Sequence, residues 1–156
     1  MSLQRFCKRP IVAITPEKSI TEACQLLEER NIGCLVVEER GKLCGILTDR
    51  DIALRVTGRG KDPQLTHVGM VMTANPVRIP VDSTLHELTM LMHGQHVRRV
   101  PIIDASGRAI GIVTLDDLLV LLGDEMSDLT KTVSEAFFRK PAEVGAEEYH
   151  WWATYT

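Results

Sequence analysis

The sequence predicts an α/β (α+β) protein in which a β-α-β-β-α unit occurs twice and is followed by a helical and aromatic C-terminal tail. Three observations predict this fold: an internal repeat, matching helix caps in both copies, and a main body without aromatic residues. With 156 residues, of which 44% are hydrophobic, the chain is long enough to bury a core. Since no Phe, Tyr or Trp occurs between Cys7 and Ala136, that core must consist of Val, Ile, Leu and Met.

The repeat appears when the sequence is shifted along itself by 65 residues, which places Ile14 on Ile79 and Glu22 on Glu87. One extra loop residue near Ala105–Ser106 then changes the offset to 66. Beyond it the matched pairs are Gly41 and Gly107, Gly45 and Gly111, Ile46 and Ile112, Thr48 and Thr114, and Asp51 and Asp117. The agreement of caps, apolar phase and turn glycines indicates a tandem duplication.

Each copy begins with a short strand and a helix. The strands are predicted at Ile11–Ile14 and Val77–Ile79, and each is followed by an S/T-x-x-E capping box. The boxes pair Ser19 with Glu22 and Thr84 with Glu87. The apolar residues that follow in each copy lie at helical spacing, which predicts an amphipathic helix.

A hairpin and a second helix complete each copy. The hairpin strands are predicted at Cys34–Val37 and Leu43–Leu47, and at Val100–Ile103 and Ile110–Val113. The second helices start at Asp49 and Leu115 and are expected to end near Gly58 and Gly123. We therefore predict repeats at 8–58 and 76–123, a linker at 59–75 and a tail at 124–156. Sheet-to-sheet packing of the two repeats would bury a shared aliphatic core.

Charge and cysteine content restrict the class of protein. The formal net charge of −3 does not fit a general nucleic-acid binder, so no nucleic-acid partner is expected. No apolar run is long enough to cross a membrane, and the first residues contain no apolar stretch typical of a signal peptide. The four cysteines, Cys7, Cys24, Cys34 and Cys44, form no C-x-x-C pair. We therefore expect a reduced, cytoplasmic protein.

The segment that enters the second helix carries the most informative motif. It is Gly45-Ile46-Leu47-Thr48-Asp49-Arg50-Asp51 in copy one and Gly111-Ile112-Val113-Thr114-Leu115-Asp116-Asp117 in copy two. Thr and Asp at these positions are typical of an N-cap and a negatively charged first turn. The same aspartate could also accept two hydrogen bonds from a ribose diol. The two interpretations are compatible, because the cap holds the carboxylate in place.

This G-h-h-T-x-x-D pattern, with β-α-β-β-α before it in both copies, resembles a tandem pair of CBS domains, the Bateman module, over about residues 8–123. The chain is similar to the stand-alone bacterial CBS-pair proteins. The resemblance implies two repeats packed by a pseudo-twofold and two clefts that bind adenosine nucleotides or S-adenosylmethionine. In that arrangement Asp51 and Asp117 hold ribose hydroxyls and Thr48 and Thr114 lie beside them. The base lies against Val12, Val77, Ile46 and Ile112.

The copies differ where the hairpin begins. Copy two has Arg98 and Arg99 where copy one has Gly33 and Cys34. The arginines are either solvated charges at a strand end or a fork for a phosphate group. In family members that sense adenylates, a basic pair at this position contacts the phosphates, so we expect unequal clefts. The arginines could serve either one. The expected ligand-binding set is completed by Gly33, Cys34, Val97, Asp116 and Arg50, the last as a weaker phosphate candidate.

Other candidates carry less information. His86, His93 and His96 lack the spacing of a metal site, so no metal is expected. Met70 and Met72 are predicted to lie in the core, on a short helical turn before the next strand. Residues 127–139 can extend or follow the last helix. The aromatic tail, with Trp151 and Trp152, is expected to pack on its own chain or a second subunit, or to dock on a foreign partner.

We expect a non-enzymatic regulatory module. It would bind AMP, ADP, ATP or S-adenosylmethionine as a ligand, use no cofactor, form a homodimer and act on a separate effector protein. Two other hypotheses are a ligand-independent scaffold protein that uses its aromatic tail, and a small metal or redox protein that uses the four cysteines.

Overall fold

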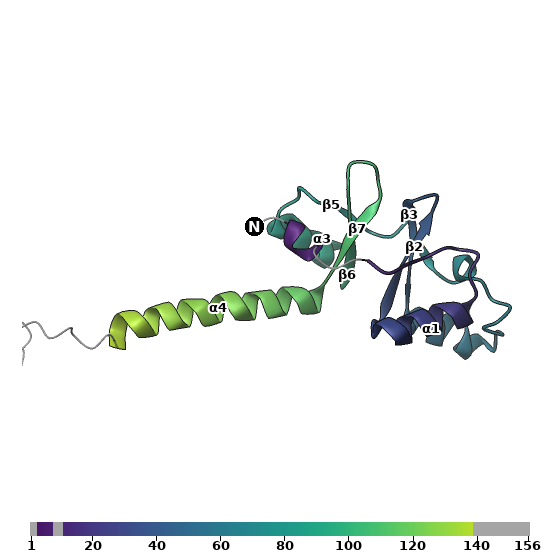
Figure 1. Ribbon diagram of the computed structural model, residues 1–156, viewed down its shortest axis with the longest axis horizontal. Helices are drawn as coiled ribbons and strands as arrows, with labels where there is room; N and C mark the ends of the chain where they lie inside the picture. Colours follow the sequence, from purple (N-terminus) through teal and green to yellow (C-terminus); the bar gives the residue numbers. More distant parts are fainter. Residues whose placement is uncertain (1–2, 8–10, 139–156) are drawn as a thin grey trace, which may run out of the picture. The chain divides into compact units, whose positions relative to one another are not determined.

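The computed structural model describes residues 3–7 and 11–138, and the chain divides into two units, residues 1–117 and 118–156. The first unit holds the first predicted repeat and the second as far as Asp117, each with its own small sheet (Figure 1). Among the described residues, the sheet of the first repeat has four strands and that of the second has three. The predicted α/β class is confirmed.

The predicted order of elements is found in both repeats. The first contains β1 (Ala13–Ile14), α1 (Ile20–Arg30), β2 (Cys34–Glu39), β3 (Lys42–Thr48) and α2 (Asp49–Arg55). The second contains β5 (Ile79–Pro80), α3 (Leu85–Gln95), β6 (Arg99–Ile103), β7 (Ala109–Thr114) and α4 (Leu115–Phe138). In each, the first strand pairs in parallel with the second, and the second and third form an antiparallel hairpin. Strands β1 and β5 are shorter than predicted and start later, whereas the hairpin strands are longer.

Both predicted capping boxes start their helices. The Ser19 backbone N–H donates to Glu22 Oε2 at 2.8 Å, and the Thr84 N–H donates to Glu87 Oε2 at 2.6 Å. Helices α1 and α3 also end alike, at residues in the left-handed conformation: Asn31 has φ of 50° and His96 has φ of 53°. Local signals thus set both ends of these helices.

The core is aliphatic, as the composition predicts. The core of the first repeat consists of Ile14, Ile20, Ala23, Leu27, Leu35, Val37, Leu47, Ile52, Val56, Val68 and Val71. A smaller cluster joins Val36 and Leu43 of the first repeat to Ala109 and Ile103 of the second. Beside it, the Leu43 N–H donates to the Gly107 carbonyl at 3.3 Å. The two repeats therefore share apolar contacts and a backbone hydrogen bond.

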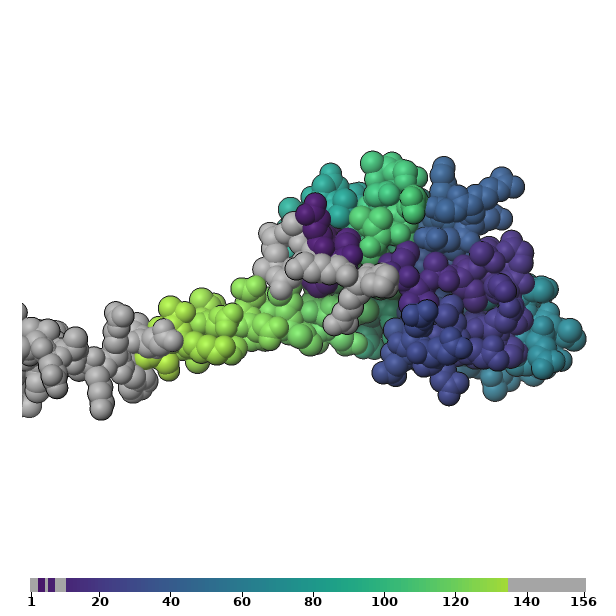
Figure 2. Space-filling view, in the orientation of Figure 1, coloured from purple at the N-terminus to yellow at the C-terminus, as the bar shows by residue number. Residues whose placement is uncertain are grey.

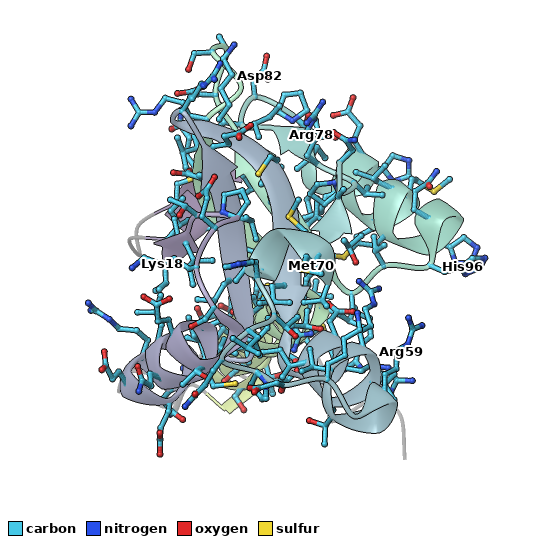
Figure 3. All side chains as sticks on the ribbon, turned by 90° about the vertical axis from the view of Figure 1, so that its right-hand side faces the viewer. Lys18, Arg59, Met70, Arg78, Asp82 and His96 are labelled. Carbon is cyan, nitrogen blue, oxygen red and sulfur yellow. The ribbon has the colours of Figure 1, made fainter. Side chains whose placement is uncertain are left out.

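The segment between the repeats is more regular than a flexible linker. It contains η2 (Thr57–Arg59), η3 (Val68–Met70) and β4 (Thr73–Ala74), which pairs with β3. The prediction for Met70 is wrong, because its side chain is 65% exposed (labelled in Figure 3). Its neighbours Val68 and Val71 fill the core instead, while Met72 is half-buried against it. The turn η3 directs only some of its apolar residues inward.

Each segment that precedes a repeat packs against the other repeat, so the two segments are exchanged. The segment before the first repeat, η1 (Leu3–Cys7), lies against β7 of the second (Figure 2). A Cβ atom on Gly111 would lie 3.0 Å from Cys7 Sγ. The segment before the second repeat lies against β3 of the first, and a Cβ atom on Gly45 would collide with Met72. Glycines in β3 and β7 thus provide the space for the two segments.

Helix α4 continues to Phe138, so the expected end near Gly123 is wrong. A glycine inside a helix costs only about 0.5–1 kcal/mol, which the helix-forming residues around it offset. The exposed apolar residues of α4 include Leu115, Leu119, Leu122, Met126, Leu129 and Val133. Within the described residues no helix combines the length and apolar character needed to cross a bilayer. The aromatic residues Tyr149, Trp151, Trp152 and Tyr155 lie outside the described part of the chain.

Candidate ligand-binding site

The site predicted in both repeats is built around a Thr–Asp pair at the start of a helix. In α2, Asp51 Oδ2 accepts from the Thr48 N–H at 3.0 Å and from Thr48 Oγ1 at 2.8 Å. In α4, Asp117 Oδ2 accepts from the Thr114 N–H at 2.9 Å and from Thr114 Oγ1 at 2.7 Å. The N-cap interpretation is therefore confirmed in both repeats. The cap uses only Oδ2 of each carboxylate, so Oδ1 takes no part in it.

Apolar candidates share a strand face with these threonines. Side chains alternate along a strand, so Ile46 lies on the face of Thr48 and Ile112 on the face of Thr114. That face is half-buried, whereas the residues between them, such as Leu47 and Val113, are buried. Val12 and Val77, both half-buried, lie just before β1 and β5 instead of within them. The structure thus places an apolar strand face next to each carboxylate.

Arg99, the first residue of β6, brings a positive charge to the first repeat. Its Nη2 atom lies 3.4 Å from the position of a Cβ atom on Gly33, and Asp49 Oδ2 lies 3.1 Å from the same position. Cys34 and Asp51 are within electrostatic range of this cluster. Burial raises the pKa of the Cys34 thiol to about 12, and the Arg99 charge opposes that shift while Asp51 and Asp49 add to it. The structure therefore brings together Gly33, Cys34, Asp51 and Arg99.

Arg98 makes a different contact, an ion pair with Asp116. Its Nη2 atom lies 3.8 Å from Asp116 Oδ1, and both side chains are about three-quarters exposed, 74% and 75%. Val97 is half-buried, and its N–H donates to the Met92 carbonyl. Arg50 is exposed on the first turn of α2. The predicted arginine pair is therefore divided, with Arg99 next to the first repeat and Arg98 next to Asp116.

Sequence reasoning missed two residues of the first repeat, Asp49 and Arg55. Arg55 Nη2 forms an ion pair with Asp51 Oδ1 at 3.1 Å. Its Nη1 also donates to the Val71 carbonyl at 2.6 Å. The spacing of four residues between Asp51 and Arg55 on a helix could have indicated the ion pair. The proximity of Asp49 to Arg99 has no local signal, because the two residues belong to different repeats.

The cysteines and histidines form no comparable centre. The four cysteines are free thiols. His86, His93 and His96 are all exposed, with the His93 and His96 rings 6.4 Å apart. Across residues 3–7 and 11–138, no three or more His, Cys, Asp or Glu side chains gather as they would around a metal ion.

The arrangement around Asp51 combines three kinds of contact. A capped carboxylate can accept hydrogen bonds from hydroxyl groups, and a guanidinium can donate to an anion. A half-buried apolar strand face can cover a ring. Around Asp117 the carboxylate and the apolar face are present, and Arg98, which precedes β6, is paired with Asp116 on the first turn of α4. The two sites thus share a plan and differ in charge.

Comparison with known proteins agrees with the duplicated fold. The model of the CBS domain matches residues 3–58 and 68–124. The chain is 41% identical over 110 residues to the CBS domain-containing protein YhcV of Bacillus subtilis, covering 70% of this chain and 77% of that protein. It is 33% identical over 112 residues to an inosine-5'-monophosphate dehydrogenase of Methanocaldococcus jannaschii, covering 71% of this chain. That match spans only 21% of the dehydrogenase, through its CBS region.

Solved structures show the same fold. The CBS domain pair of protein MJ0100, in complex with 5'-methylthioadenosine and S-adenosyl-L-methionine, superposes with a TM-score of 0.71 at 28% identity. The superposition covers 80% of this chain and 98% of that one. With both repeats matched by the family model and the paired fold shared with a solved CBS pair, this chain belongs to the CBS domain family.

Proposed function

We propose that this protein is a regulatory sensor that binds an adenine nucleotide or nucleoside and acts on a separate effector protein. The observation that carries the proposal is the repeated Thr–Asp pair, with matching hydrogen bonds in both repeats. The Asp117 carboxylate keeps Oδ1 for the hydroxyls of a ribose, and Asp51 Oδ1 keeps one lone pair beside its ion pair with Arg55. Each carboxylate lies next to an apolar strand face for the base. The ligands of the MJ0100 pair, 5'-methylthioadenosine and S-adenosyl-L-methionine, both contain adenosine and support the choice of ligand class.

The two sites take different ligands. Arg99 adds a positive charge beside Gly33, Asp49 and Asp51, so the site in the first repeat favours a phosphorylated ligand such as AMP, ADP or ATP. Arg98 contributes less, because it is highly exposed and its charge is matched by Asp116. The module performs no reaction of its own.

Isothermal titration with AMP and with adenosine tests this proposal, using Arg99→Ala and the matched control Arg98→Ala. A hydrogen bond to a charged group contributes about 1.5–3 kcal/mol, so AMP should bind the wild-type protein at least about tenfold more tightly than adenosine. Arg99→Ala should remove that difference and Arg98→Ala should keep most of it. Equal affinities for AMP and adenosine, unchanged in both variants, would contradict the role of the arginine.

The ribose contact has its own test. Replacing both Asp51 and Asp117 with alanine should abolish binding of AMP, adenosine and S-adenosylmethionine while the circular dichroism spectrum stays native. If the folded double variant binds every one of these ligands as before, the sensor function is wrong. Such a result would favour the ligand-independent scaffold instead.

The proposal includes a homodimer in the cytoplasm. It is supported by six exposed apolar residues of α4 that recur at alternating intervals of four and three, the spacing of a helix that packs against another helix: Leu115, Leu119, Leu122, Met126, Leu129 and Val133. Val120 is also exposed and lies beside this series. Light scattering should show a dimer for the wild-type chain and a monomer for Met126→Glu. Ser127→Glu, on the neighbouring exposed position, should remain dimeric. A dimeric Met126→Glu variant would exclude α4 from the interface.

A further inference from the structure

The two candidate carboxylates differ in how many hydrogen bonds they can still accept. In each, Oδ2 already accepts two hydrogen bonds from the capping threonine, Thr48 or Thr114. A carboxylate oxygen offers two lone pairs, so Oδ2 is saturated in both repeats. The matching distances show that the caps themselves are alike. Any difference between the two carboxylates themselves must therefore come from Oδ1.

At Oδ1 the repeats diverge. Asp51 Oδ1 is paired with Arg55 Nη2 at 3.1 Å, which leaves it one lone pair. The residue at the corresponding position of the second repeat is Leu121, which has no side-chain donor. Among the described residues no donor to Asp117 Oδ1 is found, so both of its lone pairs remain available.

Arg55 is not free to swing away from Asp51. Its Nη1 donates to the Val71 carbonyl at 2.6 Å, and both terminal nitrogens lie 3.3 Å from Thr73 Oγ1. The guanidinium is thus held between helix α2 and the segment that contains β4. Its side chain is 37% exposed, so these contacts and not burial hold it in place. The loss of one acceptor at Asp51 is therefore built into the fold.

We propose that Asp117 holds both hydroxyls of a ribose, whereas Arg55 restricts Asp51 to one, so that only the Asp117 site requires the 2'-hydroxyl. This inference rests on the proposed binding of adenine nucleosides and nucleotides. It assigns a vicinal diol to the second repeat. The cationic site of the first repeat recognises the phosphate groups of its ligand and accepts 2'-deoxyribose as well as ribose.

The experiment compares adenosine with 2'-deoxyadenosine by isothermal titration of the full chain. These two probes differ only in the 2'-hydroxyl. In the wild-type protein the deoxynucleoside should bind about tenfold more weakly, as expected for the loss of a hydrogen bond to a charged acceptor. The difference should persist in Asp51→Asn and disappear in Asp117→Asn. Both substitutions preserve side-chain shape, and thermal melting verifies that each variant is folded.

A second variant tests Arg55 itself. Arg55→Leu reproduces the residue of the second repeat, and in the Asp117→Asn background it should restore discrimination against 2'-deoxyadenosine. The control Arg59→Leu removes an exposed positive charge four residues further on and should restore nothing (Arg59 is labelled in Figure 3). Discrimination that survives Asp117→Asn and disappears in Asp51→Asn would overturn the assignment alone. No binding of adenosine or AMP to the wild-type protein would overturn the proposed function and the assignment together.

Discussion

Replacing Gly111 with alanine tests the exchange of the N-terminal segment onto the second repeat. Gly111 lies in β7, and a Cβ atom there would sit 3.0 Å from Cys7 Sγ, 3.2 Å from Cys7 Cα and 3.2 Å from the Phe6 carbonyl oxygen. Two of these three atoms belong to the backbone, so rotation of one side chain cannot relieve the contact. The segment η1 must shift as a whole or separate from the strand.

The loss of stability is set by whichever of the two responses, a shift of η1 or its separation from β7, requires less free energy. Overpacking of a buried site costs about 1–3 kcal/mol. Release of η1 would expose Leu3, which is fully buried, at about 1.5–3 kcal/mol. The alanine recovers about 0.4–1 kcal/mol by restricting the unfolded chain. We therefore expect a net loss of about 1–2 kcal/mol in the free energy of unfolding.

Urea unfolding followed by circular dichroism measures this loss. With a slope of about 2 kcal/mol per molar urea, the midpoint should fall by roughly 0.5–1 M. Gly94→Ala is the matched control, because Gly94 lies inside α3 and a Cβ there would meet no described atom. That variant should gain about 0.5–1 kcal/mol. If Gly111→Ala were stabilised as much as Gly94→Ala, η1 would not pack on β7 in solution.

Three further predictions concern a cap, a carboxylate and the thiols. Thr84→Ala removes the hydroxyl that bonds Glu87 and should lower stability by about 1 kcal/mol, a fall of about 2–4 °C in melting temperature by calorimetry. The Lys18 ammonium and the Ser19 N–H lower the pKa of Glu22 from 4.5 to about 2, so its stabilising effect is present above pH 4.5 and is lost as the pH falls towards 2. In Lys18→Met, NMR titration should show that pKa rising towards 4.5; an unchanged value would exclude the lysine as its cause. Because burial raises the pKa of Cys34 to about 12, Ellman's reagent at pH 8 should modify exposed Cys24 first, and rapid loss of the Cys34 thiol would contradict this burial.

Much of the fold could be predicted because its signals are local. Capping boxes join residues three apart, and the alternation in β3 and β7 places Ile46 with Thr48 and Ile112 with Thr114 without reference to the rest of the chain. The boundaries of short strands were less accurate, since β1 and β5 depend on pairing with distant partners. Gly123 does not end its helix, because the helix-forming residues on both sides of it continue α4 to Phe138.

The site was predictable in part for the same reason. The capped carboxylates of Asp51 and Asp117 follow from the motif, and both caps are present as expected. The separation of Arg98 from Arg99 could not be predicted, because adjacent residues at the start of a strand point to opposite faces and their neighbours come from other elements. The hydrogen bond from Arg55 to the Val71 carbonyl could not be predicted either, because it joins a helix to a segment sixteen residues away.

The sequence by itself therefore determined the duplication, the aliphatic core and the two Thr–Asp pairs, since each depends on spacing within one element or on composition. Only the tertiary structure decided that Arg99 reaches Gly33 and Asp49, that the segments before the repeats are exchanged, and that Arg55 makes the two carboxylates unequal. These features join residues far apart in the chain. Their positions are set by packing of the whole unit, which no local pattern encodes.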